Sequence, residues 1–184
     1  LPRLIDLDAA AHSYKGEGYN GNVIYLSTYS KTLAPALRVG VIVAAAPLMR
    51  KLVQAKQGGD LHTATLNQMI AYELDKAGFL DGQARKVAAV YRERRDVMLA
   101  ALREYFPAEM ECSSPEGGMF LWLKLPARYD TQELLQRALE KRVAFVPGTS
   151  FFADGTGKNT MRLNFSNSTP EVIREGVRRL AELL

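Results

Sequence analysis

The hydrophobic pattern at the start of the chain is strand-like. Residues 22–27 and 38–45 are short, nearly continuous apolar runs, which is typical of buried strands. A helix is expected over 47–56, where Pro47 occupies the first position, and the glycine pair Gly58–Gly59 is expected to end it. Two strands followed by a helix indicate an α/β arrangement in this part of the chain.

The pattern then becomes helical for about 40 residues. Residues 63–77 predict a helix that Gly78 closes. Apolar residues recur at spacings of three and four from Val87 to Tyr105, so a long amphipathic helix is expected over 83–106, before Pro107. The best break between two subdomains lies just before this helix, at residues 78–82.

Short strands and helices are mixed in the last third of the chain. Strands are predicted at 110–114, 119–125, 143–147 and 160–166, with a helix at 131–142. Asp130 and Glu133 resemble a capping box at the start of that helix. Thr169 and Pro170 are expected to cap and start the final helix. The order of elements favours an α/β fold with residues 1–82 and 83–184 as its two parts.

Composition narrows the class of protein. The formal net charge is +4, and the densest basic cluster, Arg92, Arg94 and Arg95, is interrupted by Glu93, so a solvated helix face is the better interpretation than a nucleic-acid surface. The single cysteine, Cys112, excludes an internal disulfide framework and favours a reducing, cytoplasmic location. No apolar run is long enough for a membrane helix.

Three sequence motifs resemble nucleotide, phosphate or metal sites but lack the context that such sites need. Residues 16–21, GEGYNG, match G-x-G-x-x-G but precede a strand instead of following one, which favours a plain connection over a nucleotide site. The loop GTGKN at 155–159 lacks the Ser or Thr and the glycine spacing of a phosphate loop. His12, His62 and Cys112 lack the spacing of zinc ligands, so no metal is expected.

The stretch YLSTYSKTLAPALRVG, residues 25–40, holds the strongest candidate chemistry. Lys31 offers an amine that can form a Schiff base, while Thr28 and Ser30 offer hydroxyls and Arg38 a two-pronged anion donor. An amine beside a phosphate clamp is what pyridoxal phosphate requires. A solvated surface lysine, or a Ser–Lys hydrolase using Ser27 or Ser30, remains open on spacing alone.

This stretch resembles the lysine-bearing segment of the class I/II aminotransferases of fold type I. The branch of 2-aminoadipate aminotransferases and the aminotransferase-like halves of MocR-type regulators are the most similar. HTATLNQMIAYEL, PEGGMFLWLKLP and VAFVPGTSFFADGTGKNTMRLNFS resemble later segments of the family in the expected order. The resemblance covers residues 22–184.

The resemblance implies a fold and a set of roles. Residues 1–82 would be the C-terminal part of the cofactor-binding large domain, and 83–184 a small α+β domain that includes the long helix. Lys31 would be the Schiff-base lysine and proton carrier, and Thr28, Ser30 and Arg38 would hold the phosphate of pyridoxal 5′-phosphate. Arg162 would bind the α-carboxylate of the substrate. Gly117 and Gly118 would allow a close approach of the backbone.

The resemblance also implies a function for a longer protein. The family's earlier half, which supplies the partner of the pyridine nitrogen, has no counterpart in these residues, so the chain is expected to be a C-terminal portion that is inactive alone. The parent is expected to be a homodimeric aminotransferase acting on an amino acid and a 2-oxo acid. One alternative is a cofactor-sensing domain of a MocR/GntR-type regulator, which would bind nucleic acid only through a preceding DNA-binding domain. Another is an interaction module without a cofactor.

Overall fold

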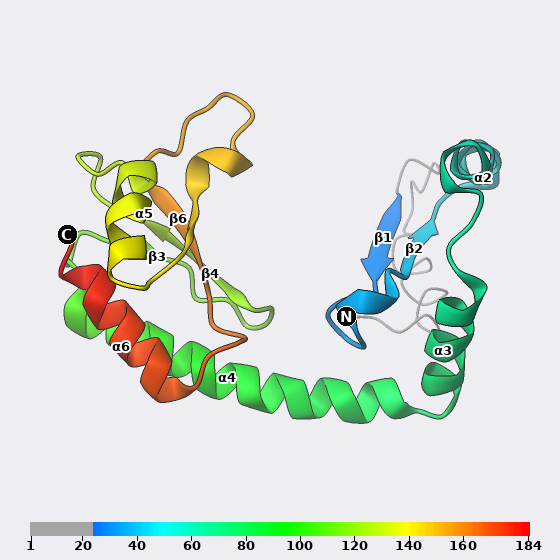
Figure 1. Ribbon diagram of the computed structural model, residues 1–184, viewed down its shortest axis with the longest axis horizontal. Coiled ribbons are helices and arrows are strands. Elements are labelled where there is room, and N and C mark those ends of the chain that lie inside the picture. The colour runs from blue at the N-terminus through cyan, green and yellow to red at the C-terminus, as the bar shows by residue number, and fades with distance from the viewer. Residues whose placement is uncertain (1–23) are drawn as a thin grey trace, which may run out of the picture. The chain divides into compact units, whose positions relative to one another are not determined.

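The chain divides into two compact units in the computed structural model, which describes residues 24–184. The first unit extends to Ala84 and the second is Arg85–Leu184 (Figure 1). Each unit is built differently, since a two-stranded sheet with helices characterises the first and a four-stranded sheet with its own core the second.

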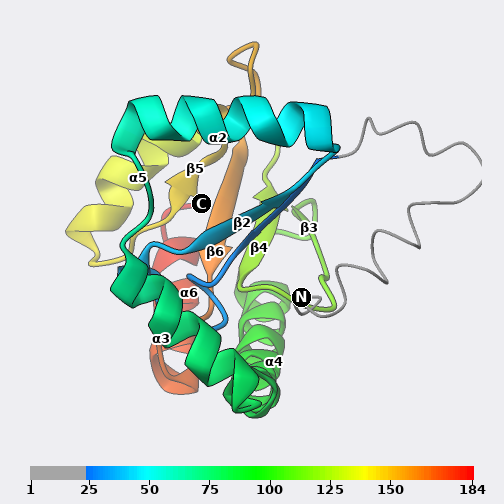
Figure 2. The same ribbon diagram turned by 90° about the vertical axis from the view of Figure 1, so that its right-hand side faces the viewer.

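A short antiparallel hairpin organises the first unit. Strand β1 (Tyr25–Thr28) runs beside β2 (Gly40–Val43) (Figure 1 and Figure 2). The last register pair is Thr28 with Gly40. A single 3-10 turn, η2 (Pro35–Leu37), lies in the connection between the strands. The residues from 29 to 39 therefore form the loop at one end of this hairpin.

Two helices follow the hairpin, and the first is longer than its glycines suggest. Helix α2 (Ala46–Asp60) includes Gly58 and Gly59, so the expectation that they end it is wrong. Each interior glycine costs about 1 kcal/mol relative to alanine, which a continuous hydrogen-bonded helix tolerates. The helix ends instead at Leu61, whose φ of 65° is incompatible with a further helical turn. Helix α3 (Thr65–Lys76) closes as predicted at Gly78, with φ of 71°.

The strands of the first unit are less buried than the sequence suggests. Leu26 is 68% exposed and Ile24 49%, so the expectation of a buried strand at 22–27 is wrong for the part that the structure describes. Among the described apolar side chains of this unit, only Val39 and Ala71 are buried. A two-stranded sheet needs a covering layer to bury such side chains, and none covers β1 within the described chain.

The long helix begins earlier than its periodicity predicts. Helix α4 runs over Phe79–Tyr105, with Gly82 in its first turns, and Pro107 follows its end. Its buried residues are Met98, Ala101 and Leu102, all in the C-terminal half. That half belongs to the core of the second unit.

The second unit is centred on an antiparallel sheet of order β3–β4–β6–β5. The strands are β3 (Glu111–Cys112), β4 (Phe120–Lys124), β5 (Val146–Pro147) and β6 (Thr160–Asn164). All four expected strands are present, and each is shorter than its predicted range. Strand β5 keeps only the last two residues of 143–147. The register pairs Trp122 of β4 with Arg162 of β6, and Arg162 in turn with Val146 of β5.

Three helices cover one face of this sheet. Alternate strand residues, including Leu121, Leu123, Met161 and Leu163, are buried against α4, α5 (Thr131–Glu140) and α6 (Pro170–Ala181) (Figure 1). Asp130 caps α5 by accepting from the backbone N–H of Gln132. Thr169 caps α6, as predicted. Because side chains alternate along a strand, the residues between these core positions lie on the other face.

Candidate functional site

The loop after β1 is organised by its own hydroxyl groups. Thr28 Oγ1 accepts from the backbone N–H of Ser30 at 3.1 Å and lies 3.0 Å from Ser30 Oγ, to which it donates. The backbone N–H of Tyr29 donates to Val39 C=O at 3.1 Å, which closes the loop at its base. Thr28 therefore fixes the turn, through Ser30 on one side and Val39 C=O, 3.4 Å away, on the other.

Arg38, two residues before β2, has an uncommon backbone conformation. Its φ and ψ are 53° and 37°, the left-handed region, where a non-glycine residue is held at a cost of about 1–3 kcal/mol. The guanidinium donates to Pro35 C=O at 3.0 Å and is otherwise exposed.

Lys31 lies one residue further into the same loop. It is exposed and makes no hydrogen bond or ion pair with any residue that the structure describes. Its amine is thus not engaged by a carboxylate of the described chain. Thr28, Ser30, Lys31 and Arg38 therefore all belong to the end of β1 or to the loop between β1 and β2.

Helix α3 is hydrogen-bonded to this loop. Asn67 Nδ2 donates to Leu37 C=O at 2.9 Å, which ties the residue before Arg38 to the helix. Tyr29, between the two hydroxyl residues, is partly buried, and burial, with a smaller contribution from Asp75, raises the pKa of its phenol above 10. Tyr29 is therefore neutral near pH 7 and supports the loop by packing.

Arg162 belongs to the second unit and is far from these residues in the sequence. It lies in the middle of β6, half-buried, on the face that the helices do not cover. Its guanidinium carbon is 4.1 Å from the centre of the Phe120 ring and 4.8 Å from that of Phe151. Nε is buried and has no hydrogen-bond partner in the described chain. An arginine held this way has its donors available to an added anion.

The aromatic residues around Arg162 were not part of the predicted site. Phe151 comes from the turn η3 (Gly148–Phe151), and Trp122 packs edge-on against it at 5.3 Å and 83°. A period of two in MFLWLKL places Phe120 and Trp122 on one face and the core leucines on the other, which is a signal that the sequence does contain. Phe151 carries no such signal, because its position depends on how η3 folds back over β6.

The glycine pair before β4 has a conformational role. An added Cβ would meet no described atom within 4 Å at either Gly117 or Gly118, so the expected close backbone approach is not observed within the described chain. Gly118 has φ of 83°, which favours glycine in the turn into β4.

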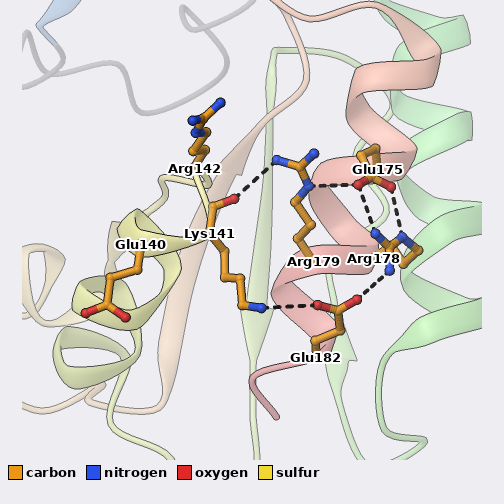
Figure 3. Close-up of a pocket in the computed structure, with 7 residues that line it drawn as sticks. All are labelled: Glu140, Lys141, Arg142, Glu175, Arg178, Arg179 and Glu182. Atoms are coloured by element: carbon orange, nitrogen blue, oxygen red, sulfur yellow. Dashed lines mark hydrogen bonds and ion pairs between the residues drawn. The ribbon is translucent and has the colours of Figure 1, made fainter.

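A charged hollow of about 390 Å³ lies between the end of α5 and α6 (Figure 3). Glu175 accepts from Arg178 at 2.8 Å and from Arg179 at 2.7 Å, and Glu182 pairs with Arg178 and with Lys141. The hydrogen bonds from Arg178 and Arg179 lower the pKa of Glu175 to about 2. These paired charges join the end of α5 to α6, while Glu140 in the same hollow has no ion pair in the described chain.

The remaining candidates for chemistry are ruled out within the described residues. No group of three or more His, Cys, Asp or Glu side chains could hold a metal ion there. Burial raises the pKa of the Cys112 thiol, which makes it a weak nucleophile at neutral pH. GEGYNG and His12 lie outside the described residues. None of the described helices is both long and apolar enough to cross a bilayer.

The fold and the loop with its lysine match a known family. The family model "Aminotransferase class I and II" matches residues 6–180, and the chain belongs to this family. The predicted resemblance and fold class are therefore confirmed.

Individual relatives agree with this assignment. The chain is 49% identical over 184 residues to 2-aminoadipate transaminase of Thermus thermophilus, covering all of this chain and 44% of that protein. The solved structure of α-aminoadipate aminotransferase from the same species, complexed with N-(5′-phosphopyridoxyl)-L-leucine, superposes with a TM-score of 0.86 at 47% identity, over 100% of this chain and 45% of the other. Pyrococcus horikoshii kynurenine aminotransferase, solved with pyridoxamine phosphate (PMP), superposes equally well, at 44% identity over 90% of this chain and 41% of that one.

The chain also matches regulators, at lower identity. A helix-turn-helix-type transcriptional regulator of Bacillus subtilis is 30% identical over 165 residues, which cover 90% of this chain and 34% of the regulator. The chain spans less than half the length of each of these relatives.

Proposed function

We propose that the protein containing this chain is a pyridoxal-phosphate-dependent aminotransferase that moves an amino group between an amino acid and a 2-oxo acid. The observation that carries the proposal is the loop 28–38, which presents a hydroxyl, a guanidinium and an amine that has no partner among the described residues, at one end of the β1–β2 hairpin. Relatives of known structure carry phosphopyridoxyl and pyridoxamine phosphate groups, which supports this cofactor.

The donors in the loop fit the phosphate of that cofactor. The Ser30 hydroxyl, which contacts Thr28, would donate one hydrogen bond to a phosphate oxygen, and the Arg38 guanidinium would add charge-assisted bonds. The left-handed backbone of Arg38 is a local strain that an anion held by its side chain would offset. Thr28 contributes by holding the turn.

Lys31 is the proposed catalytic residue. When bound, pyridoxal phosphate supplies an aldehyde carbon and a ring that delocalises negative charge from the substrate α-carbon. The Lys31 amine would hold the aldehyde, and Nζ would carry the proton of the substrate α-carbon. An amine that pairs with no carboxylate of the described residues suits both tasks.

Arg162 is the proposed carboxylate-binding residue. A guanidinium with no polar partner in the described chain matches the two oxygens of an α-carboxylate by parallel charge-assisted hydrogen bonds. Such bonds fix the substrate's orientation.

Reductive labelling tests the role of Lys31. The chain is incubated with pyridoxal phosphate, reduced with borohydride, and digested for mass spectrometry. We expect the label on Lys31 in preference to the exposed lysines Lys51 and Lys56 of α2, and its loss in Lys31→Arg. Preferential label on Lys31 excludes an interaction module without a cofactor. Absence of a Lys31 label in the complete polypeptide would contradict the proposal.

A regulator is the second candidate, because helix-turn-helix-type regulators are among the matches. The same loop would then sense the cofactor without turnover. A transamination assay of the complete polypeptide, together with a search of its remaining sequence for a DNA-binding domain, separates the two. The higher identity to aminotransferases favours the enzyme.

The remaining expectations concern the complete polypeptide. We propose a homodimer in the cytoplasm, because the lone cysteine of these residues fits a reducing compartment and the family resemblance implies paired subunits. Sedimentation analysis of the complete polypeptide tests the oligomeric state, and a monomer would contradict it.

A further inference from the structure

The two faces of the β4–β6 pair have separate surroundings. Leu121 and Leu163 lie on one face and are buried in the helical core. Trp122 and Arg162 are directly opposed on the other face, and Phe120 is the diagonal neighbour of Arg162. Arg162 is therefore placed by β-sheet register among aromatic side chains and away from the core.

Two rings hold the guanidinium. Phe120 and Phe151 lie within 5 Å of its central carbon, close enough for a cation–π interaction with each. Phe151 is itself supported by the edge-on Trp122 ring, and Trp122 also packs at 6.1 Å from Phe152. The Phe152 ring in turn packs closely against Gly157, where an added Cβ would lie 2.3 Å from the ring.

Arg162 differs from the other half-buried arginines of the second unit in its polar contacts. These others, Arg94, Arg95 and Arg179, each donate to a carboxylate or a carbonyl of the described chain. Arg162 does neither, although it is half-buried. Its Nε is covered, whereas the two terminal nitrogens, equally without a partner, are not among the buried atoms. Aromatic contacts replace the acidic partner that such a residue ordinarily has.

We propose that Phe120 and Phe151 form an aromatic clamp that positions Arg162, fixing the plane of its guanidinium while leaving the two terminal nitrogens for a carboxylate. The proposal rests on the carboxylate-binding role of Arg162 given above. A carboxylate partner from the protein would also fix the guanidinium, but it would compete with the ligand for the same donors. An aromatic ring contacts the face of the guanidinium and uses none of them.

The proposal predicts a graded loss of carboxylate affinity. Phe120→Leu keeps an apolar side chain but removes the ring that is closer to the guanidinium, so we expect affinity to fall roughly two- to thirtyfold. Phe151→Leu, at the longer distance and in a more exposed position, is expected to lose less. Phe120→Tyr retains the ring face and should restore wild-type affinity.

Two measurements test this. The first, on the 184-residue chain, is the heteronuclear NOE of the Arg162 Nε–H resonance without ligand, expected to be high in the wild type and in Phe120→Tyr and lower in Phe120→Leu. The second, on the complete polypeptide, is the dissociation constant for pyruvate, with methyl pyruvate, which lacks the carboxylate, as the control. Phe165→Leu is the matched variant, because it removes a buried ring on the opposite face and should lower stability without changing either measurement.

The outcomes separate the clamp from the proposed role of Arg162. Equal NOE values in Phe120→Leu and in the wild type would overturn the clamp, whatever the dissociation constant for pyruvate. Pyruvate binding that is absent from the wild type, or that survives in Arg162→Gln, would overturn the carboxylate-binding role. Arg162-dependent binding with the same affinity in Phe120→Leu would overturn the clamp alone.

Discussion

Gly148 occupies a position where even a methyl group does not fit. A Cβ there would lie 1.7 Å from Thr160 Oγ1 and 2.8 Å from the Thr160 carbonyl oxygen. Thr160 cannot easily move away, because its hydroxyl donates to Gly157 C=O at 2.7 Å and its residue lies within β6. Gly148 therefore fixes the start of η3, the turn that carries Phe151.

At the residue scale, we predict that Gly148→Ala destabilises the second unit by about 1–3 kcal/mol through overpacking. Gly117→Ala is the control, because its Cβ would meet nothing within 4 Å and its φ lies outside the left-handed region. Urea unfolding monitored by Trp122 fluorescence measures both. Equal midpoints for the two variants would contradict the steric argument.

The candidate site was only partly predictable at this scale. Lys31, Arg38 and Arg162 follow from the resemblance of their segments to a family, and their roles remain predictions. The left-handed conformation of Arg38 has no signal in its residue type, since glycine or asparagine would be the usual choice. The contact of Phe151 with Arg162 depends on tertiary folding, which a local pattern does not contain.

At the scale of the element, α6 is held by charges as well as by its core face. Arg178 and Arg179 donate to Glu175 within the helix, and Glu182 extends the network to Lys141 at the end of α5 (Figure 3). Hydrogen bonds from these arginines lower the pKa of Glu175 from 4.5 to about 2. A carboxyl whose pKa is lowered by folding stabilises the folded state in its ionised form.

This shift gives a pH prediction for the second unit. The contribution of Glu175 is complete above pH 4.5 and is lost as the pH falls towards about 2, so the stability difference between wild type and Glu175→Gln should shrink over that range. Urea midpoints from pH 7 downward measure it, and the effect should be small because the pair is exposed to solvent. Glu140→Gln in the same hollow, which has no ion pair in the described chain, should show no such trend.

Element boundaries were predictable where a local signal dominates. Thr169 and Pro170 mark the start of α6 because a cap and a preset φ act on neighbouring residues. Gly58 and Gly59 do not end α2 as predicted, because the hydrogen bonds of the helix outweigh the propensity cost of two glycines. The apolar run 143–147 yields only a two-residue strand, since strand length depends on the pairing partner in β6.

On the scale of the whole molecule, the two units differ in how much apolar surface they bury. The second unit has a contiguous core drawn from α4, β4, β6, α5 and α6. The described part of the first unit has two buried apolar residues, Val39 and Ala71. The free energy of local unfolding rises with the number of buried apolar contacts, so it should be lower for the first unit than for the second.

Hydrogen–deuterium exchange of the 184-residue chain tests this difference. We predict that backbone amides of β1 and β2 exchange well before those of β4 and β6, although both pairs are hydrogen-bonded antiparallel ladders. Comparable protection of the two ladders would contradict the prediction. The sequence did not reveal the difference, because the apolar runs of β1 and β2 look like those of buried strands.

The alternation of side chains along β4 and β6 has a consequence for how such a protein can change over generations. Neighbouring residues such as Met161 and Arg162, or Leu121 and Trp122, face different surroundings, so a substitution at one position leaves the other's contacts intact. Drift at the aromatic positions can therefore alter the surroundings of Arg162 without eroding the core. Two neighbouring codons can thus be under unrelated selection, one for the core and one for the surroundings of Arg162.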